Sequence, residues 1–309
     1  MRRGIYHNRG NNPKSRKTWG QAAYEWLNQW DGKDFRRQKD AVKVLLPHIG
    51  TVPLCNLNNA SFEGYKEAQQ GKSASTINLE IGVAKRVVRF AVEILEWHDY
   101  VPHVKTVKGT VRVVHPLSWE QQDRLFAYAK PWWVNAYQFA VNTGIRPNEM
   151  FGLKWNNIEP FMDGMIAVPE ETKNGKKRAV IVNSLGKLAV ERQKKYGGKY
   201  IFCSQSYHNK GGRVVSWGDA WSRPAEKAGL PKGDDVRGGM YILRHTTAYR
   251  LGRVGAPSEV IRQFLGHANA NITEHYTDPA LERLMEWGEK ITVRPQGKEL
   301  MLCNIGLAS

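Results

Sequence analysis

The sequence predicts a mainly α-helical protein of the α+β class, built from two domains, the second of which holds one small antiparallel sheet. Apolar residues recur at steps of three and four along most of the chain, a spacing typical of amphipathic helices. Two turn dipeptides, Asp163-Gly164 and Asn174-Gly175, lie beside short runs of β-favouring residues and predict hairpins. Residues 101–116 hold two prolines and a glycine, and they predict an extended basic linker between the domains.

The charge of the chain points to a polyanionic partner. The 309 residues include 46 Lys and Arg against 29 Asp and Glu, which gives a formal net charge of +17 and a pI near 9.8. Each phosphate that a basic protein neutralises releases counterions, so this excess favours nucleic acid as the partner. The alternative interpretation is a basic surface that only aids solubility.

Other features of the composition argue against a membrane or secreted protein. No apolar run approaches the ~20 residues that a membrane span requires. The basic N-terminus lacks the apolar stretch of a signal peptide. The cysteines Cys55, Cys203 and Cys303 are odd in number and far apart, which fits neither a disulfide framework nor a metal-ligand cluster. We therefore expect a cytoplasmic protein with reduced thiols.

The N-terminal part of the chain predicts a basic arm followed by a helical domain. Residues 1–17 carry six Lys or Arg and no acid, with Gly, Asn and Pro among them, and are expected to be flexible. The first domain follows at 18–100. Its first helix is predicted to begin at Thr18, and two more are predicted at about 35–47 and 60–70.

The fourth helix of this domain has the clearest pattern. Ser75 or Thr76 is the expected cap, and apolar residues follow in steps of four and three from Ile77 to Leu95. Three basic side chains lie off the apolar stripe, and two of them are four residues apart and therefore neighbours on the helix. They are either a solvated polar face or, as the basic arm favours, a face that follows DNA phosphates: Lys85, Arg86 and Arg89.

The second domain is predicted at 117–290. It begins near Ser118, which can cap a helix with Glu120 and Gln121 in the following turn. The runs 165–168 and 179–182 beside the two turn dipeptides supply strands of the small sheet. Helices are predicted at about 118–129, 132–142, 184–196, 216–228, 241–253, 257–265 and 279–289.

Two basic residues of this domain are candidates for contact with a phosphate. Arg146 follows Gly144 and opens a stretch predicted to be helical through Leu153 and Trp155, and its planar guanidinium can bind a phosphate in bidentate fashion. The alternative for Arg146 is a surface salt bridge to Glu149. Lys173 precedes Asn174-Gly175 at a predicted hairpin tip, where its ammonium can donate a proton to a leaving oxygen, or can simply be solvated.

Further candidates lie nearer the C-terminus. Arg244 lies early in a predicted helix, and its neighbour His245 is about 100° round that helix, so the two cannot point at one phosphate oxygen. His267 follows Gly266 at a predicted helix end, and Tyr276 comes nine residues later. Considered alone, this histidine and this tyrosine are each more typical of structural positions than of catalysis.

Taken in order, these residues resemble the tyrosine recombinases, the phage-integrase family. The resemblance is carried by Thr143-Gly144-Ile145-Arg146 with Glu149, by Lys173-Asn174-Gly175, by Leu243-Arg244-His245, and by Leu265-Gly266-His267 with Tyr276. It covers about residues 115–290. The helical module before it resembles the core-binding (SAM-like) domain of that family, and the second domain its catalytic domain.

The resemblance implies DNA cleavage and rejoining through a tyrosyl ester. Arg146 and Arg244 would clamp the scissile phosphate, Lys173 would protonate the leaving 5′-hydroxyl, and His267 would hydrogen-bond a phosphate oxygen. Tyr276 would attack to form a 3′-phosphotyrosyl link. Neither ATP nor a metal nor another cofactor is implied, because the ester conserves the energy of the phosphodiester and guanidinium groups stabilise its charge.

One position departs from the family pattern. The usual second motif is H-x-x-R, and here Tyr241 stands three residues before Arg244. A phenol can donate a hydrogen bond to the phosphate but is a poor base at neutral pH. Tyr241 would therefore keep the phosphate contact while water or another group accepts the proton of the nucleophile.

The resemblance also implies partners. These are double-stranded DNA with specific core sites, a homotetramer on paired sites that exchanges strands through a Holliday junction, and accessory DNA-bending proteins. The basic arm and the irregular second motif favour a phage or mobile-element integrase over a Xer-type dimer resolvase. A catalytically silent DNA-binding regulator and a type IB topoisomerase remain alternatives.

The C-terminal tail, residues 291–309, allows two interpretations. Its apolar and β-favouring residues are too few to form a core of their own. The tail either packs on its own domain or docks on a neighbouring protomer, where it can add a strand to the small sheet.

Overall fold

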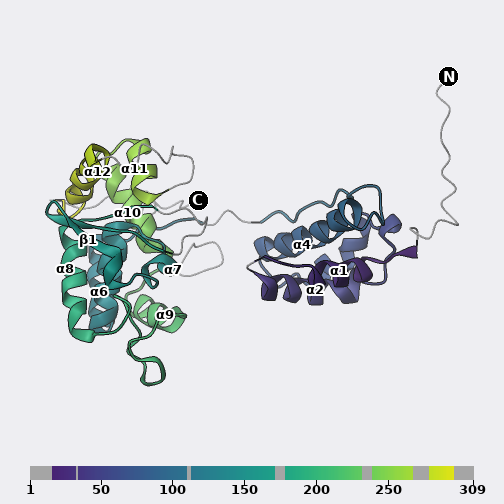
Figure 1. Cartoon of the computed structure of the whole chain (residues 1–309), viewed down its shortest axis with the longest axis horizontal. Coiled ribbons are helices and arrows are strands. Elements are labelled where there is room, and N and C mark those ends of the chain that lie inside the picture. The colour runs from purple at the N-terminus through teal and green to yellow at the C-terminus, as the bar shows by residue number, and fades with distance from the viewer. Residues whose placement is uncertain are drawn as a thin grey trace, which may run out of the picture. The chain divides into compact units, whose positions relative to one another are not determined.

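The computed structural model describes residues 16–32, 34–109, 113–170, 178–231, 239–266 and 278–295. The chain divides into two compact units, Met1–Val111 and Arg112–Ser309, each with its own hydrophobic core (Figure 1). The division lies within the segment 101–116. Within the described parts of the chain, no helix is both long and apolar enough to cross a membrane.

The first unit is a bundle of α1 (Trp19–Asn28), α2 (Phe35–Ile49), α3 (Glu63–Ala68) and α4 (Ala74–Glu93). Short 3-10 turns at Leu54–Asn56 and Ala60–Phe62 lead into α3. Thr18 caps α1 as predicted, in a reciprocal capping box with Gln21. Trp19 is fully buried, and its indole Nε1 donates a hydrogen bond to the carbonyl of Ala84, which ties α1 to α4 at 3.3 Å.

Three helix bounds in this unit differ from the prediction. The cap of α4 is Ser73, not Ser75 or Thr76: the Ser73 hydroxyl accepts from the Thr76 amide at 3.3 Å, and residues 74 onward are already helical. Helix α2 runs past Pro47 to Ile49, which is fully buried in the core, so packing outweighs the missing proline donor in the last turn. The third predicted helix is split between the 3-10 turn at Ala60–Phe62 and α3.

The extended segment 101–109 packs on the first unit. Val104 is buried in its core. The side-chain amide of Asn78 donates to the Val107 carbonyl at 2.9 Å and accepts from the Val107 amide at 2.7 Å, as a neighbouring strand would. The first half of the predicted linker is therefore held along α4.

The second unit is mostly helical and holds a three-stranded antiparallel sheet in the order β1-β2-β3. Its strands are β1 (Ile158–Phe161), β2 (Gly164–Ala167) and β3 (Val180–Val182). Phe161 pairs with Gly164 across the turn, which confirms the hairpin predicted at Asp163-Gly164. Asn174-Gly175 lies outside the described residues. The helices are α5 (Trp119–Tyr128), α6 (Pro131–Thr143), α7 (Pro147–Met150), α8 (Ser184–Gln193), α9 (Gly218–Lys227), α10 (Tyr241–Arg253), α11 (Ser258–Leu265) and α12 (Asp278–Lys290).

Strand β3 lies between two parts of the core of this unit. Val180 and Val182 join the cluster around α6, whereas Ile181 joins the cluster formed by α11 and α12. This division follows from the alternation of side chains along a strand. The sheet thereby links α6, which carries the Thr143-Gly144 turn, to α11, which ends at Leu265-Gly266.

Candidate active site

Arg146 is placed by a tight turn between α6 and α7. Gly144 ends α6 in the left-handed conformation, with φ of +61°. A Cβ at this position would lie 2.4 Å from Cδ2 of Leu265, so the turn requires glycine for both its conformation and its close packing. Thr143 fixes the turn from inside, since its hydroxyl donates to the Phe139 carbonyl at 2.8 Å and accepts from the Ile145 amide at 3.3 Å. Arg146 then stands at the N-cap of α7.

The helix that Arg146 opens is shorter than predicted. Helix α7 ends at Met150, so Leu153 and Trp155 follow in a turn and a 3-10 segment instead of a continuous helix. The salt bridge to Glu149 is nevertheless present, with Nη1 of Arg146 2.9 Å from Oε1. Nη2 of Arg146 also donates to the Gly266 carbonyl at 3.4 Å. The guanidinium therefore faces both a buried carboxylate and the end of α11.

Arg244 lies in the first turns of α10 and is buried, with 7% of the residue exposed. Its Nη1 donates to the Gly144 carbonyl at 2.6 Å, and its Nη2 donates to the Leu265 carbonyl at 2.7 Å. Burial, reinforced by the charges of Arg146 and Arg178, lowers the pKa of Arg244 to about 9. The negative charge of an anion bound beside the guanidinium would act in the opposite direction and raise this pKa.

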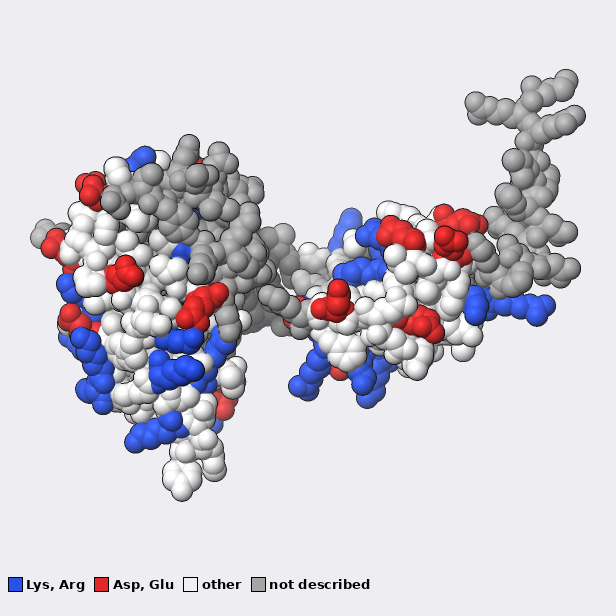
Figure 2. Space-filling view, in the orientation of Figure 1, with Lys and Arg blue, Asp and Glu red and all other residues white. Residues whose placement is uncertain are grey.

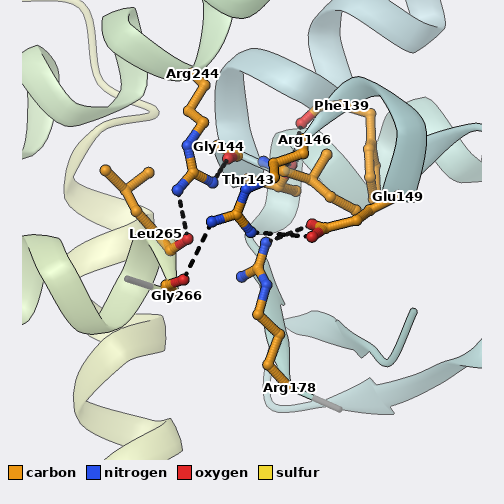
Figure 3. A network of polar contacts seen from close by, with 10 residues as sticks. Phe139, Thr143, Gly144, Arg146, Glu149, Arg178, Arg244, Leu265 and Gly266 are labelled. Carbon is orange, nitrogen blue, oxygen red and sulfur yellow. Dashed lines mark hydrogen bonds and ion pairs between the residues drawn. The ribbon is translucent and has the colours of Figure 1, made fainter. Parts of the chain in front are cut away.

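The end of α11 brings the two predicted arginines together, as Figure 3 shows. The carbonyls of Leu265 and Gly266 are adjacent and accept from Arg244 and Arg146 respectively. Carbonyls at a helix C-terminus are unpaired within the helix and carry partial negative charge, so they suit guanidinium groups. The structure thus brings the first, third and fourth sequence motifs together around one point.

A third arginine, Arg178, completes this cluster and was missed in the sequence. Its Nη2 lies 2.8 Å from Oε2 of Glu149, whose side chain is 2% exposed. Burial acts to raise the pKa of Glu149, but the charges and hydrogen bonds of Arg178 and Arg146 outweigh it and hold the pKa below its ordinary value. The run Lys176-Lys177-Arg178 offers no local signal that separates Arg178 from its neighbours.

The charge of the cluster favours an anion. Two of the three guanidinium groups pair with one carboxylate, and the third binds backbone carbonyls, so Arg146, Arg178, Arg244 and Glu149 together carry a formal excess of two positive charges in a largely buried place. Buried charge of one sign is costly unless it is compensated. A phosphodiester, which carries one negative charge and presents two oxygens in a plane, would compensate half of this excess.

Tyr241 is the first residue of α10 and is 43% exposed. It lies one turn before Arg244, and residues three apart share a helix face. An exposed hydroxyl there can donate to a ligand that Arg244 also contacts.

The remaining predicted catalytic residues, Lys173, His267 and Tyr276, lie outside the described residues. Lys173 belongs to the segment 171–177, which ends directly before Arg178. His267 and Tyr276 belong to the segment 267–277, which begins directly after Gly266. Within the described ranges, no cluster of three or more His, Cys, Asp or Glu residues has the geometry of a metal site.

The predicted DNA face of the first unit is partly engaged in internal contacts. Lys85 Nζ donates to the Val104 carbonyl at 2.8 Å, and Arg86 Nη2 donates to Gln38 Oε1 at 3.0 Å. Arg89 is exposed, with Glu93 at 4.0 Å. Burial lowers the pKa of Arg86, and the charge of Arg37 on α2 lowers it further, so Arg37 is a third arginine beside this face, which the sequence did not predict.

Basic side chains also gather elsewhere on the surface. Figure 2 shows Lys and Arg along the lower edge of the first unit and over the lower part of the second in this view. On the second unit, exposed basic residues lie in the last turn of α8 and directly after it: Arg192, Lys194, Lys195 and Lys199.

Residues 115–283 match the model of the phage integrase family. The integrase of Salmonella phage P22 is 22% identical over 228 residues, which cover 71% of this chain and 58% of that protein. The tyrosine recombinase XerD of Halalkalibacterium halodurans is 24% identical over 235 residues, which cover 72% of this chain and 77% of that protein. The tyrosine recombinase XerC of Thermodesulfovibrio yellowstonii is 30% identical over 160 residues, and there the match spans only half of the relative.

Solved structures share the fold. A lambda integrase tetramer bound to a Holliday junction superposes with a TM-score of 0.66 at 22% identity, covering 88% of this chain and 84% of that one. The Tn1549 transposon integrase in complex with transposon right end DNA superposes with a TM-score of 0.66 at 18% identity, covering 87% of this chain and 99% of that one.

Proposed function

The chain belongs to the phage integrase family, and on this premise we propose that it is a site-specific DNA recombinase that cleaves and rejoins DNA through a 3′-phosphotyrosyl intermediate. The observation that carries the proposal is the convergence of Arg146 and Arg244 on the adjacent carbonyls of Gly266 and Leu265. These carbonyls directly precede the segment that holds His267 and Tyr276.

Phosphoryl transfer depends mainly on positioning and on stabilising the charge that spreads over the phosphate oxygens. Two guanidinium groups held by backbone carbonyls are preorganised for this task, because they need little rearrangement during the reaction. Glu149 fixes Arg146 through a bond of 2.9 Å. Arg244 is fixed by bonds of 2.6 Å and 2.7 Å.

The proposed steps balance without an external source of energy. The Tyr276 oxygen bonds to phosphorus, the bond from phosphorus to the 5′-oxygen breaks, and Lys173 gives that oxygen a proton. His267 and Tyr241 donate hydrogen bonds to the phosphate, and water takes the phenol proton of Tyr276. A 5′-hydroxyl of another strand then attacks the tyrosyl ester, which restores a phosphodiester and frees the tyrosine.

We further propose the partners of this reaction. Double-stranded DNA with specific core sites is the substrate, contacted in the first unit by Arg89 and the Arg37–Arg86 pair and by the basic residues 1–17. A homotetramer on paired sites is the proposed active assembly, which the lambda integrase tetramer on a Holliday junction supports by analogy of fold. Accessory DNA-bending proteins are further proposed partners. The proposed location of the reaction is the bacterial cytoplasm or nucleoid.

Within the family, we favour integration or excision of a phage or other mobile element. The similarity to the P22 integrase supports this role. The similarity to XerD and XerC keeps dimer resolution as the alternative. A silent DNA-binding regulator would keep the fold but form no covalent adduct.

The test is capture of the covalent intermediate. A pool of duplexes with a randomised core is selected for binding to the full chain, and the enriched sequence is then made with a nick at each successive position. A nick beside the cleaved bond releases a short fragment and traps the tyrosyl ester. An adduct that withstands denaturation and maps to Tyr276 supports recombinase chemistry. Tight, specific binding with no adduct at any nick position would favour the silent regulator.

A further inference from the structure

Arg178 makes contacts that the proposed reaction does not yet use. Its guanidinium donates to Glu149 at 2.8 Å, and its side chain is 14% exposed. On the basis of the proposed function, we propose that Arg178 is a positioning residue for DNA cleavage. It orients Arg146 through Glu149, and its side chain packs against the backbone of Gly266 and fixes the position of that residue.

Arg146 and Arg178 share the carboxylate of Glu149. Oε1 of Glu149 binds Arg146 and Oε2 binds Arg178, so each oxygen of one buried carboxylate is taken by a different guanidinium (Figure 3). A carboxylate bound on both oxygens cannot rotate without losing one partner. The position of the Arg146 guanidinium therefore depends on Arg178, although the two arginines lie far apart in the sequence.

Arg178 also contacts Gly266. A Cβ built on Gly266 would lie 2.6 Å from both Cδ and Nη1 of Arg178, closer than real Cβ atoms approach other heavy atoms. The side chain of Arg178 thus lies directly against the backbone of Gly266, which has a φ of +65°. The same glycine offers its carbonyl to Arg146 at 3.4 Å.

Arg178 and Gly266 are also next in sequence to the two segments that hold the other proposed catalytic residues. Arg178 directly follows the segment 171–177, which holds Lys173, and Gly266 directly precedes the segment 267–277, which holds His267 and Tyr276. One side-chain contact therefore joins the ends of the two segments that supply the proposed acid and nucleophile. A displacement of about 1 Å in such groups can cost about 100-fold in rate.

The test compares single-turnover cleavage of the selected nicked duplex by the full chain and its variants. Arg178→Gln should slow adduct formation by about 10- to 100-fold, the usual loss when an orienting partner is removed, with DNA affinity unchanged. Arg178→Lys keeps the charge but not the planar fork, and should recover part of the rate. Arg213→Gln is the matched control, because Arg213 donates to the Asn148 carbonyl of α7 at 3.2 Å without reaching Glu149.

A double-mutant cycle separates positioning from direct contact with the phosphate. If Arg178 acts through Glu149, the variant Arg178→Gln with Glu149→Gln should be no slower than the slower single variant. If the fold-loss in cleavage rate of the double variant equals the product of the losses of the two single variants, Arg178 acts independently of Glu149. That result would overturn the inference.

The remaining outcomes are also decisive. Cleavage by Arg178→Gln at the wild-type rate would overturn the inference but not the proposed function. So would a loss that is fully explained by a lower melting temperature and disappears on cooling. Failure of the wild-type chain to form any adduct would instead overturn the proposed function, and the inference with it.

Discussion

The guanidinium of Arg244 is bonded at 2.7 Å to the carbonyl of Leu265, the last residue of α11. This hydrogen bond joins α10, which begins at Tyr241, to the end of α11, two residues before His267. The same guanidinium reaches the Gly144 carbonyl at 2.6 Å, so it also fixes the turn that presents Arg146. Arg244 is therefore both a proposed phosphate ligand and the bond that holds three motifs together.

Tyr276→Phe should abolish covalent attachment to DNA and leave site binding nearly intact. The change removes only the hydroxyl, and most of the affinity comes from phosphate contacts elsewhere. Denaturing gels of the nicked duplex measure the adduct, and gel shifts measure binding. A phenylalanine variant that still forms an adduct would mean that another residue is the nucleophile.

Arg146→Lys and Arg244→Lys should each slow cleavage by about 100-fold or more, a loss typical of removing one preorganised donor to a developing charge. An ammonium keeps the charge but cannot make two bonds in one plane, and Arg244 uses two such bonds to backbone carbonyls. The loss should appear in the rate of adduct formation and not in affinity for DNA. Near-normal cleavage by either variant would remove that arginine from the site.

Gly144→Ala should destabilise the second unit more than Gly255→Ala does. Both glycines have positive φ, +61° and +83°, so each alanine pays about 1–3 kcal/mol of backbone strain. Only Gly144 is also crowded, with Leu265 2.4 Å from the added Cβ, whereas nothing lies within 4 Å at Gly255. Urea unfolding of the two variants measures the difference, and equal losses would show that packing against Leu265 adds nothing.

Ser73→Ala should cost about 1 kcal/mol of the stability of the first unit, the usual value of an N-cap side chain. Ser75→Ala is the control, since Ser75 lies within the first turn of α4 and alanine is the better helix former there. Thermal melts followed by circular dichroism compare the two. If Ser75→Ala lowers the stability more than Ser73→Ala does, the N-cap is Ser75, as predicted from the sequence.

Deleting residues 296–309 should weaken cooperative assembly on paired sites more than binding to a single half-site. The predicted tail, 291–309, is too long a deletion for this purpose, because Ile291 is buried in the core with α11 and α12. Arg294 also belongs to its own unit, 2.5 Å from Asp123. The shorter deletion therefore leaves these contacts in place while it tests docking on a second protomer. Unchanged cooperativity in analytical ultracentrifugation of the DNA complexes would contradict that docking.

Features that depend on neighbours in the chain could be predicted from the sequence. Thr18 and Ser118 cap their helices with the glutamines three residues on. Asp163-Gly164 turns between β1 and β2, and α10 covers the predicted range 241–253. The caps and the hairpin depend on residues within one turn, and the helix depends on a pattern that repeats along one segment. Propensity and periodicity act over this range. The order and spacing of the motifs likewise indicated the family.

The tertiary structure alone decided which charged groups far apart in the sequence meet. Nothing local distinguishes Arg178 from the lysines before it, or shows that Lys85 points to the Val104 carbonyl. Glu149, an ordinary acid three residues after Arg146, proves to be the buried centre of two ion pairs. Long charged side chains can reach many partners, and the packing of α6, α10, α11 and β3 selects among them. A buried carboxylate must be compensated wherever the fold places it, and that place depends on contacts between residues far apart in the sequence.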